Sequence, residues 1–156
     1  MTTPRPALPP RGLAALARRY AANPTTWSVD PEFDPVDRWY ARLASAADHE
    51  AWLLTWLPGQ ATDLHDHGGS AGAFHVVSGA LTEQTPRRGL RMTSRRYPAG
   101  STRPFGARHI HRVANEGVVP AISLHVYGPA LTSMTRYRIE RGALCVAAVE
   151  RAGANW

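Results

Sequence analysis

The sequence predicts a single all-β domain, either a sandwich or a small barrel, with one short helix ahead of it. About nine short strand candidates follow one another at spacings of 8–15 residues, and turns rich in glycine and proline separate them. Regular short strands of this kind are typical of sandwiches and small barrels. Only one segment has the apolar spacing that a helix requires. A length of 156 residues suits one domain.

The first part of the chain, residues 1–37, is expected to be an N-terminal extension. It is rich in proline at its start and contains one helical segment, residues 12–22, with apolar residues on one face. Asn23-Pro24 ends this helix, because proline cannot continue it. The β domain then occupies residues 38–156.

The strand candidates are apolar or alternating segments that stop at glycine, proline or asparagine. Ser78-Gly79 joins two of them as a hairpin turn. The apolar run 143–149 near the end of the chain predicts a buried strand. In order, the candidates are residues 39–43, 51–57, 73–77, 80–84, 90–97, 109–113, 121–127, 132–139 and 144–149.

Charge and composition exclude several classes of partner. The 18 basic residues are all arginine and, with 12 acidic residues, give a formal net charge of +6. The arginines are scattered instead of clustering with aromatic residues, so we expect no nucleic-acid partner. No apolar run approaches the length of about 18 residues that a membrane helix needs, so we expect no membrane partner. The lone Cys145 favours a reducing compartment, and we expect a cytoplasmic monomer.

The histidines carry the strongest functional signal. His65 and His67 are two residues apart, so on a strand both imidazoles would project from one face, about 7 Å apart along the backbone. His109 and His111 repeat this spacing on a later segment. The first pair suits two ligands on one metal ion. His109 and His111 are the candidates for a further ligand.

The residue types alone do not choose the metal. Neutral imidazole ligands with open positions on the metal suit iron(II) that reacts with oxygen, and they also suit a zinc or nickel ion that activates water.

A second polar group lies on one strand. Ser123, His125 and Tyr127 alternate with apolar residues, so all three side chains face the same way. Hydroxyl, imidazole and phenol in this order can form a hydrogen-bond relay.

Glycines around the first histidine pair extend the pattern. The stretch G-x5-H-x-H-x4-G-x6-G, from Gly59 to Gly79, resembles the first motif of the cupin superfamily, although it lacks that motif's glutamate. Residues 104–115 resemble the second motif, and its H-x3-N spacing falls on His111 and Asn115. The two motifs together imply a metal site with three histidine ligands, of which we expect His111 to be the third, with His109 as the alternative. The resemblance implies a cupin-type small β-barrel, that is, a double-stranded β-helix or jelly roll.

Within the cupins, the pattern resembles the cysteine dioxygenase family of thiol dioxygenases. This resemblance implies one iron(II) ion per chain, bound by His65, His67 and His111, with Ser123, His125 and Tyr127 as a catalytic relay. It implies oxidation of a small thiol carboxylate, L-cysteine, by O2 to cysteine sulfinic acid. The matching segments are residues 56–60, 65–70, 111–113 and 123–129.

The resemblance also implies a substrate anchor and leaves alternatives open. Tyr40-Ala41-Arg42 is similar to the family's carboxylate-binding segment, with Arg38 as a rival anchor. An arginine favours cysteine, whereas relatives acting on 3-mercaptopropionate tend to carry glutamine there. Gly72 stands where animal members carry a cysteine cross-linked to the relay tyrosine, so no Cys–Tyr cross-link is expected. The alternative from another class is a non-catalytic cupin that binds a metal or an effector.

Overall fold

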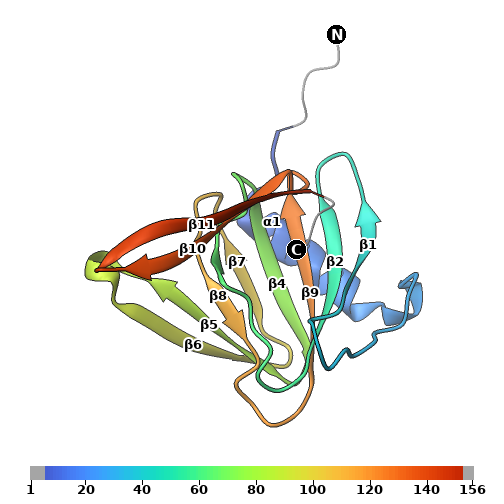
Figure 1. The fold of residues 1–156 in the computed structure, drawn as a ribbon. Coiled ribbons are helices and arrows are strands. Elements are labelled where there is room, and N and C mark those ends of the chain that lie inside the picture. Colours follow the sequence, from blue (N-terminus) through green and yellow to red (C-terminus); the bar gives the residue numbers. More distant parts are fainter. Residues whose placement is uncertain (1–5, 153–156) are drawn as a thin grey trace.

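One helix precedes a set of strands that form three sheets (Figure 1). The computed structural model describes residues 6–152. Helix α1 spans Pro10–Ala22, and two short 3-10 helices lie at Pro24–Thr26 and Arg88–Leu90. The predicted fold class, all-β with one N-terminal helix, is therefore confirmed.

The strands lie close to the segments that the sequence predicts. Their bounds are β1 Tyr40–Ser45, β2 Glu50–Trp56, β3 Leu64–His65, β4 Ala71–Ser78, β5 Ala80–Pro86, β6 Met92–Pro98, β7 Thr102–Phe105, β8 Arg112–Ala114, β9 Ala121–Gly128, β10 Ser133–Glu140 and β11 Ala143–Arg151.

The largest sheet has the strand order β1-β2-β9-β4-β7, and the two three-stranded sheets have the orders β11-β10-β3 and β6-β5-β8. Neighbouring strands in all three sheets are antiparallel. Large side chains from several strands meet in one interior core. Its members include Trp56, Phe74, Leu81, Tyr97, Phe105, Val113 and Tyr127. Because antiparallel strands alternate their faces, the opposite face of the large sheet needs a second cover.

Helix α1 provides this cover by packing on β4, β7 and β9. Leu13 and Ala17 of the helix are fully buried, in one cluster with Leu124 and Val126 of β9. Burial of a leucine side chain is worth about 1.5–3 kcal/mol, so the helix is held mainly by its apolar face. Since Leu124 and Val126 face the helix, the residues that alternate with them on β9, Ser123, His125 and Tyr127, face the interior.

Two strands were not predicted, and each has a local reason. Strand β3 contains only two residues, too few for an alternating pattern. Strand β7 contains Pro104, which disfavours an interior strand, but β7 lies at the edge of its sheet, where proline is tolerated.

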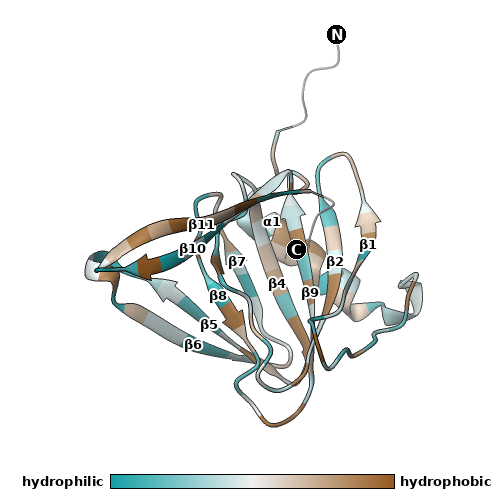
Figure 2. Cartoon of the chain, viewed as in Figure 1, coloured by the Kyte–Doolittle hydropathy of each residue, from teal (hydrophilic) through white to brown (hydrophobic). Residues whose placement is uncertain are grey.

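The prediction of a buried strand near the end of the chain is wrong. Strand β11 is an edge strand, and it is drawn largely in brown in Figure 2 because of its apolar residues. Val146 and Val149 are nevertheless 57% and 64% exposed. An edge strand has only one neighbour, and here the far face of the hairpin is left uncovered.

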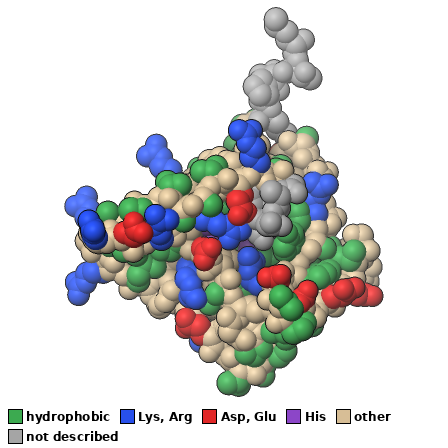
Figure 3. Space-filling view, in the orientation of Figure 1, with side chains coloured by type: hydrophobic (Ala, Val, Ile, Leu, Met, Phe, Trp, Pro, Cys, Tyr) green, Lys and Arg blue, Asp and Glu red, His purple; other side chains and the backbone are tan. Residues whose placement is uncertain are grey.

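Charged side chains of both signs share the surface. On the face shown in Figure 3, acidic side chains lie between the arginines. The β10–β11 hairpin illustrates this, with an Arg136–Glu150 ion pair at 3.1 Å and an Arg138–Glu140 ion pair at 2.7 Å. No described helix has both the length and the apolar character needed to cross a bilayer.

Candidate functional site

Three histidine side chains from two distant segments converge in the interior. His65 ends β3, His67 follows two residues later, and His111 directly precedes β8. Their ring centroids are 4.7–4.9 Å apart. One ligand atom from each ring lies within 4.8 Å of the others, and all three residues are buried. This arrangement allows one metal ion to contact all three imidazoles.

Backbone contacts hold the two segments together at the ligand positions. The backbone N–H of His65 donates to the carbonyl of His111 at 3.0 Å, and the reverse bond is 3.1 Å long. Between the first two histidines, the Asp66 carboxylate accepts the backbone N–H of Thr135 at 3.0 Å and the Tyr137 hydroxyl at 2.7 Å. Asp66 thus ties the histidine pair to β10 and is not a candidate ligand.

The hydrogen bonds of the rings leave ligand atoms available. The Nδ1–H of His65 donates to the carbonyl of Asp63 at 2.8 Å, because a carbonyl can only accept. The Nδ1 of His111 faces the Glu83 carboxylate at 2.9 Å. His67 is fully buried, and neither of its ring nitrogens has a hydrogen-bond partner among the described residues. A buried, unpaired imidazole is costly, and a bound metal would satisfy it, so these residues fit a metal.

Burial keeps the three imidazoles neutral. It holds the pKa of His65 and of His67 well below 6.5, and the neighbouring His111 acts in the same direction. Burial also lowers the pKa of His111, although its hydrogen bond to Glu83 opposes this. Neutral imidazole is the form that binds metals, so the site is ready to bind one at neutral pH.

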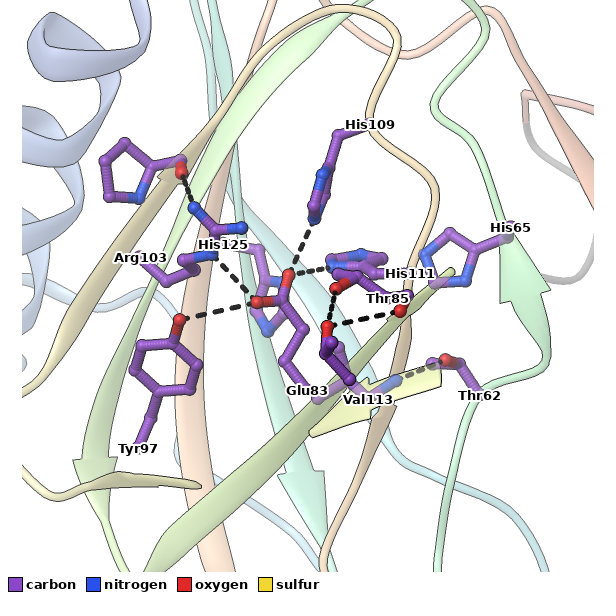
Figure 4. Close-up of polar contacts among 12 residues, drawn as sticks. Thr62, His65, Glu83, Thr85, Tyr97, Arg103, His109, His111, Val113 and His125 are labelled. Carbon is purple, nitrogen blue, oxygen red and sulfur yellow. Dashed lines mark hydrogen bonds and ion pairs between the residues drawn. The ribbon is translucent and has the colours of Figure 1, made fainter. Parts of the chain in front are cut away.

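A buried carboxylate lies behind the third histidine (Figure 4). Glu83 of β5 is 3% exposed. Its Oε1 accepts hydrogen bonds from His109 Nε2 at 2.7 Å and His111 Nδ1 at 2.9 Å. Its Oε2 accepts Arg103 Nε at 2.8 Å and the Tyr97 hydroxyl at 3.4 Å. Burial alone would raise the pKa of Glu83, but the hydrogen bonds from the two histidines and Arg103 outweigh it and hold the pKa below its ordinary value.

Glu83 is not among the site residues that the sequence predicts. One signal was available, because Leu81 and Glu83 share a face of the predicted strand 80–84, and a charged residue on an apolar face needs a buried partner. The structure also separates the two candidates for the third ligand. His111 joins His65 and His67, while His109 binds Glu83.

The predicted relay is connected through hydrogen bonds. The Trp56 indole N–H donates to Ser123 Oγ at 2.8 Å, and Ser123 Oγ lies 2.8 Å from His125 Nε2. Since the indole can only donate, the hydroxyl hydrogen of Ser123 is available for His125 Nε2. In the tautomer in which Ser123 donates to Nε2, the neutral His125 carries its hydrogen on Nδ1, which faces the Tyr127 oxygen at 3.4 Å. The Tyr127 O–H is left free to donate into the cavity.

Burial sets the protonation states of this relay. It lowers the pKa of His125 to about 3, with smaller contributions from His111 and Arg38. It also raises the pKa of Tyr127 above its ordinary value, so this residue stays a protonated donor. The Tyr127 ring stacks on His67 at a centroid distance of 5.4 Å, which brings the phenol next to the three-histidine group.

A cavity extends from His65, His111, His125 and Tyr127. Its walls are mostly apolar and include Trp52, Leu54, Trp56, Leu131 and Met134. Tyr40, one of the two predicted substrate-binding residues, also lines it. Two cationic side chains, Arg38 and Arg136, also line the cavity, and no aspartate or glutamate is among the described lining residues.

Arg42, the predicted carboxylate anchor, lies outside this cavity. It is exposed, and its guanidinium is 6.0 Å from the centre of the Trp52 ring. Trp52 is directly opposite Arg42 in the β1–β2 register, and its bulky indole lines the cavity in that region. In the structure Arg42 therefore does not contribute to the lining of the cavity.

Arg38, the rival, occupies the better position. Its guanidinium lies 5.1 Å from the centre of the Trp56 ring, and burial lowers its pKa. No hydrogen bond or ion pair joins it to another described residue. Arg136 differs, because it pairs with Glu150 at 3.1 Å and Asp63 at 3.4 Å.

Gly72 lies against the relay tyrosine, where the resemblance places the cross-linking cysteine of animal members. A Cβ at this position would lie 2.5 Å from the Phe105 ring and 3.0 Å from the Tyr127 ring. Phe105 thus takes up the space beside Gly72. The single cysteine, Cys145, lies on β11 and does not line the cavity.

Comparisons with known proteins place the chain in a protein family. The model of the family described as cysteine dioxygenase type I matches residues 10–140. Cysteine dioxygenase type 1 of Homo sapiens is 26% identical over 129 residues, and the match covers 74% of this chain and 62% of the human protein. The match to the Bos taurus protein has the same values. The chain thus spans less than two thirds of the length of these relatives.

Similar solved structures support the cupin-type jelly roll. A protein of Thermus thermophilus has a TM-score of 0.57 at 23% identity, covering 64% of this chain and 90% of that one. A double-stranded β-helix protein of Klebsiella pneumoniae has a TM-score of 0.56 at 16% identity, covering 75% and 90%. At these identities the similarity shows the fold alone.

Proposed function

The chain belongs to the cysteine dioxygenase type I family, and from this premise we propose that it is an iron(II)-dependent thiol dioxygenase whose substrate is L-cysteine. In this reaction both atoms of O2 are added to the thiol sulfur, giving the sulfinic acid. The sulfur is oxidised and O2 is reduced, so no other co-reactant is needed.

The observation that carries the proposal is the group of three buried, neutral histidines. His65 and His111 each hold a hydrogen on Nδ1 and leave Nε2 available, and His67 has no other partner among the described residues. Iron(II) bound by these three residues would supply the Lewis acidity that favours the thiolate and the electrons that O2 activation requires. The donor set is neutral, so the ion keeps its full charge for the substrate thiolate.

We assign the substrate carboxylate to Arg38. Its unpaired guanidinium offers a planar set of donors, which binds a carboxylate in a bidentate manner. Stacking on Trp56 fixes the plane of this group. The substrate would then be held at two ends, with its thiol at the histidines and its carboxylate at Arg38, and this orientation favours reaction at the sulfur.

The relay of Ser123, His125 and Tyr127 supplies a second hydrogen-bond donor for the substrate, in addition to Arg38. Tyr127, oriented through His125 and Ser123, can donate to an oxygen atom of the substrate carboxylate or to oxygen that is being added to sulfur. Because burial raises the pKa of Tyr127, its hydroxyl is protonated at neutral pH and can act as this donor.

One observation favours a second candidate substrate, 3-mercaptopropionate or another mercapto-acid. The cavity has no acidic side chain among its described lining residues, so the protein itself offers the ammonium group of cysteine no ion pair. A thiol acid without an amino group would leave no buried charge unpaired.

The test is oxygen consumption by protein loaded with iron(II) under anaerobic conditions, with L-cysteine and 3-mercaptopropionate in separate assays. We expect one sulfinate per O2 consumed, and the ratio of the two kcat/KM values identifies the preferred thiol. The His67→Ala variant, which removes a ligand, should bind no iron and consume no O2. Full iron occupancy without sulfinate from either thiol would instead support a cupin that binds a metal or an effector without catalysis.

A further inference from the structure

We propose that Glu83 is a positioning residue of the metal centre, which fixes both the tautomer and the ring orientation of His111. The inference rests on the proposed metal centre, because it assigns the role of a residue behind one of the three ligands. Glu83 does not line the cavity, and its hydrogen bonds reach His111 but neither His65 nor His67, so its effect must pass through His111.

The Glu83 carboxylate is held so that it cannot rotate. Oε2 is held by Arg103 at 2.8 Å and by the Tyr97 hydroxyl at 3.4 Å, on the side away from His111 (Figure 4). Oε1 accepts both imidazoles, from His109 at 2.7 Å and from His111 at 2.9 Å. With four donors on two oxygens and 3% exposure, the direction of Oε1 is set by the surrounding strands.

The Glu83 carboxylate also selects the tautomer of His111. A carboxylate can only accept, so the His111 nitrogen that faces it must carry the hydrogen, and this nitrogen is Nδ1. The lone pair is then on Nε2, which is the ligand atom available toward His65 and His67. Carboxylate–histidine pairs behind metals act in this way, and their loss weakens metal affinity about 10–100-fold.

A competing interpretation is a second metal site. Ligand atoms of Glu83, His109 and His111 also lie within 4.8 Å of one another. In the structure, however, these atoms are already paired, because both imidazoles donate to Oε1. The Arg103 guanidinium on the same carboxylate adds a positive charge that opposes a cation there.

The first experiment uses the wild-type protein without metal, so it needs no variant for the measurement itself. Long-range proton–nitrogen correlation spectra of protein with labelled histidine report which ring nitrogen carries the hydrogen, and His111→Gln identifies the His111 signals. We expect the Nδ1–H form of His111 at neutral pH. A dominant Nε2–H form would overturn the proposal.

The second experiment measures metal affinity in Glu83→Gln, which keeps the shape but adds a donor, so that both His111 tautomers become possible. Chelator competition should show Fe(II) affinity lowered about 10–100-fold, and the visible spectrum of the Co(II)-loaded protein should change. Glu50→Gln is the matched control, since Glu50 is 4% exposed and its carboxylate accepts the backbone N–H of Leu131 at 2.8 Å, whereas no hydrogen bond joins it to His65, His67 or His111. It should leave the affinity and the spectrum as in the wild type.

Three results would contradict the positioning role. Folded Glu83→Gln with wild-type affinity and spectrum would show that Glu83 does not position His111. An equal loss of affinity in Glu50→Gln would show a general effect of removing a buried charge. Loss of a second metal equivalent would make the cluster a metal site instead. None of these readouts involves thiol oxidation, so wild-type protein that binds iron but forms no sulfinate would refute only the proposed function.

Discussion

Arg38 and Arg42 are four residues apart, yet their guanidinium groups lie in different surroundings. Arg38 lines the cavity and stacks on Trp56, while Arg42 is exposed beside Trp52. A hydrogen bond to a charged group is worth about 1.5–3 kcal/mol, or about ten- to hundredfold in affinity.

We therefore expect Arg38→Gln to raise the KM for the thiol substrate about ten- to hundredfold, because the carboxylate loses its charged partner. Steady-state kinetics with matched Arg38→Gln and Arg42→Gln variants measures this effect. A large rise in KM for Arg42→Gln with no change for Arg38→Gln would restore the anchor that the sequence predicts.

The contribution of the Tyr127 hydroxyl to catalysis can be tested in the same way, with a single substitution. Tyr127→Phe keeps the ring that stacks on His67 but removes the donor, so iron should stay bound while kcat falls about ten- to hundredfold. Iron content and kcat are measured on the same sample. Tyr20→Phe is a control, because the Tyr20 hydroxyl bonds His49 on the helix side, at 2.9 Å. Unchanged kcat in Tyr127→Phe would remove this hydroxyl from the mechanism.

At the level of elements, the alternation of residue types along a strand predicted which side chains share a face. Alternation on β9 correctly placed Ser123, His125 and Tyr127 on one face, since Leu124 and Val126 face the helix. A contact such as Glu83 to His111 depends on the pairing of β5 with β8, which no local pattern encodes. The same holds for Arg38, because only the packed cavity distinguishes it from Arg42.

The close approach of β4, β7 and β9 can be tested at Gly72. A Cβ there would lie 2.5 Å from the Phe105 ring and 3.0 Å from the Tyr127 ring, so Gly72→Ala should lower the free energy of unfolding by about 1–3 kcal/mol. Urea denaturation measures this loss. Gly106→Ala is the matched control, since its Cβ would meet no atom within 4 Å. Equal free energies of unfolding for the two variants would show that β4, β7 and β9 can shift to accommodate the added Cβ at little cost.

On the scale of the whole molecule, the five-stranded sheet separates two environments. Helix α1 and the outer face of the sheet form an apolar cluster, while on the inner face His125 of β9 lies against the large side chains of Trp56 and Phe74. His65, His67 and His111 come from other segments and are also buried, and burial lowers the pKa of all four histidines below 6.5. The fold therefore holds these imidazoles in the neutral form, and its stability depends on pH.

The free energy of unfolding should fall as the pH falls, because the unfolded chain binds more protons than the folded protein. Below about pH 6.5 the unfolded chain protonates its histidines, whereas folded His125 stays neutral down to about pH 3. The contribution of such a group is complete above pH 6.5 and is lost as the pH falls, at about 1.4 kcal/mol per pH unit. Urea denaturation of metal-free protein at about pH 7 and about pH 5 should show this loss. His125→Gln should make the pH dependence shallower by about that slope, and an unchanged slope would mean that His125 is already protonated in the folded protein.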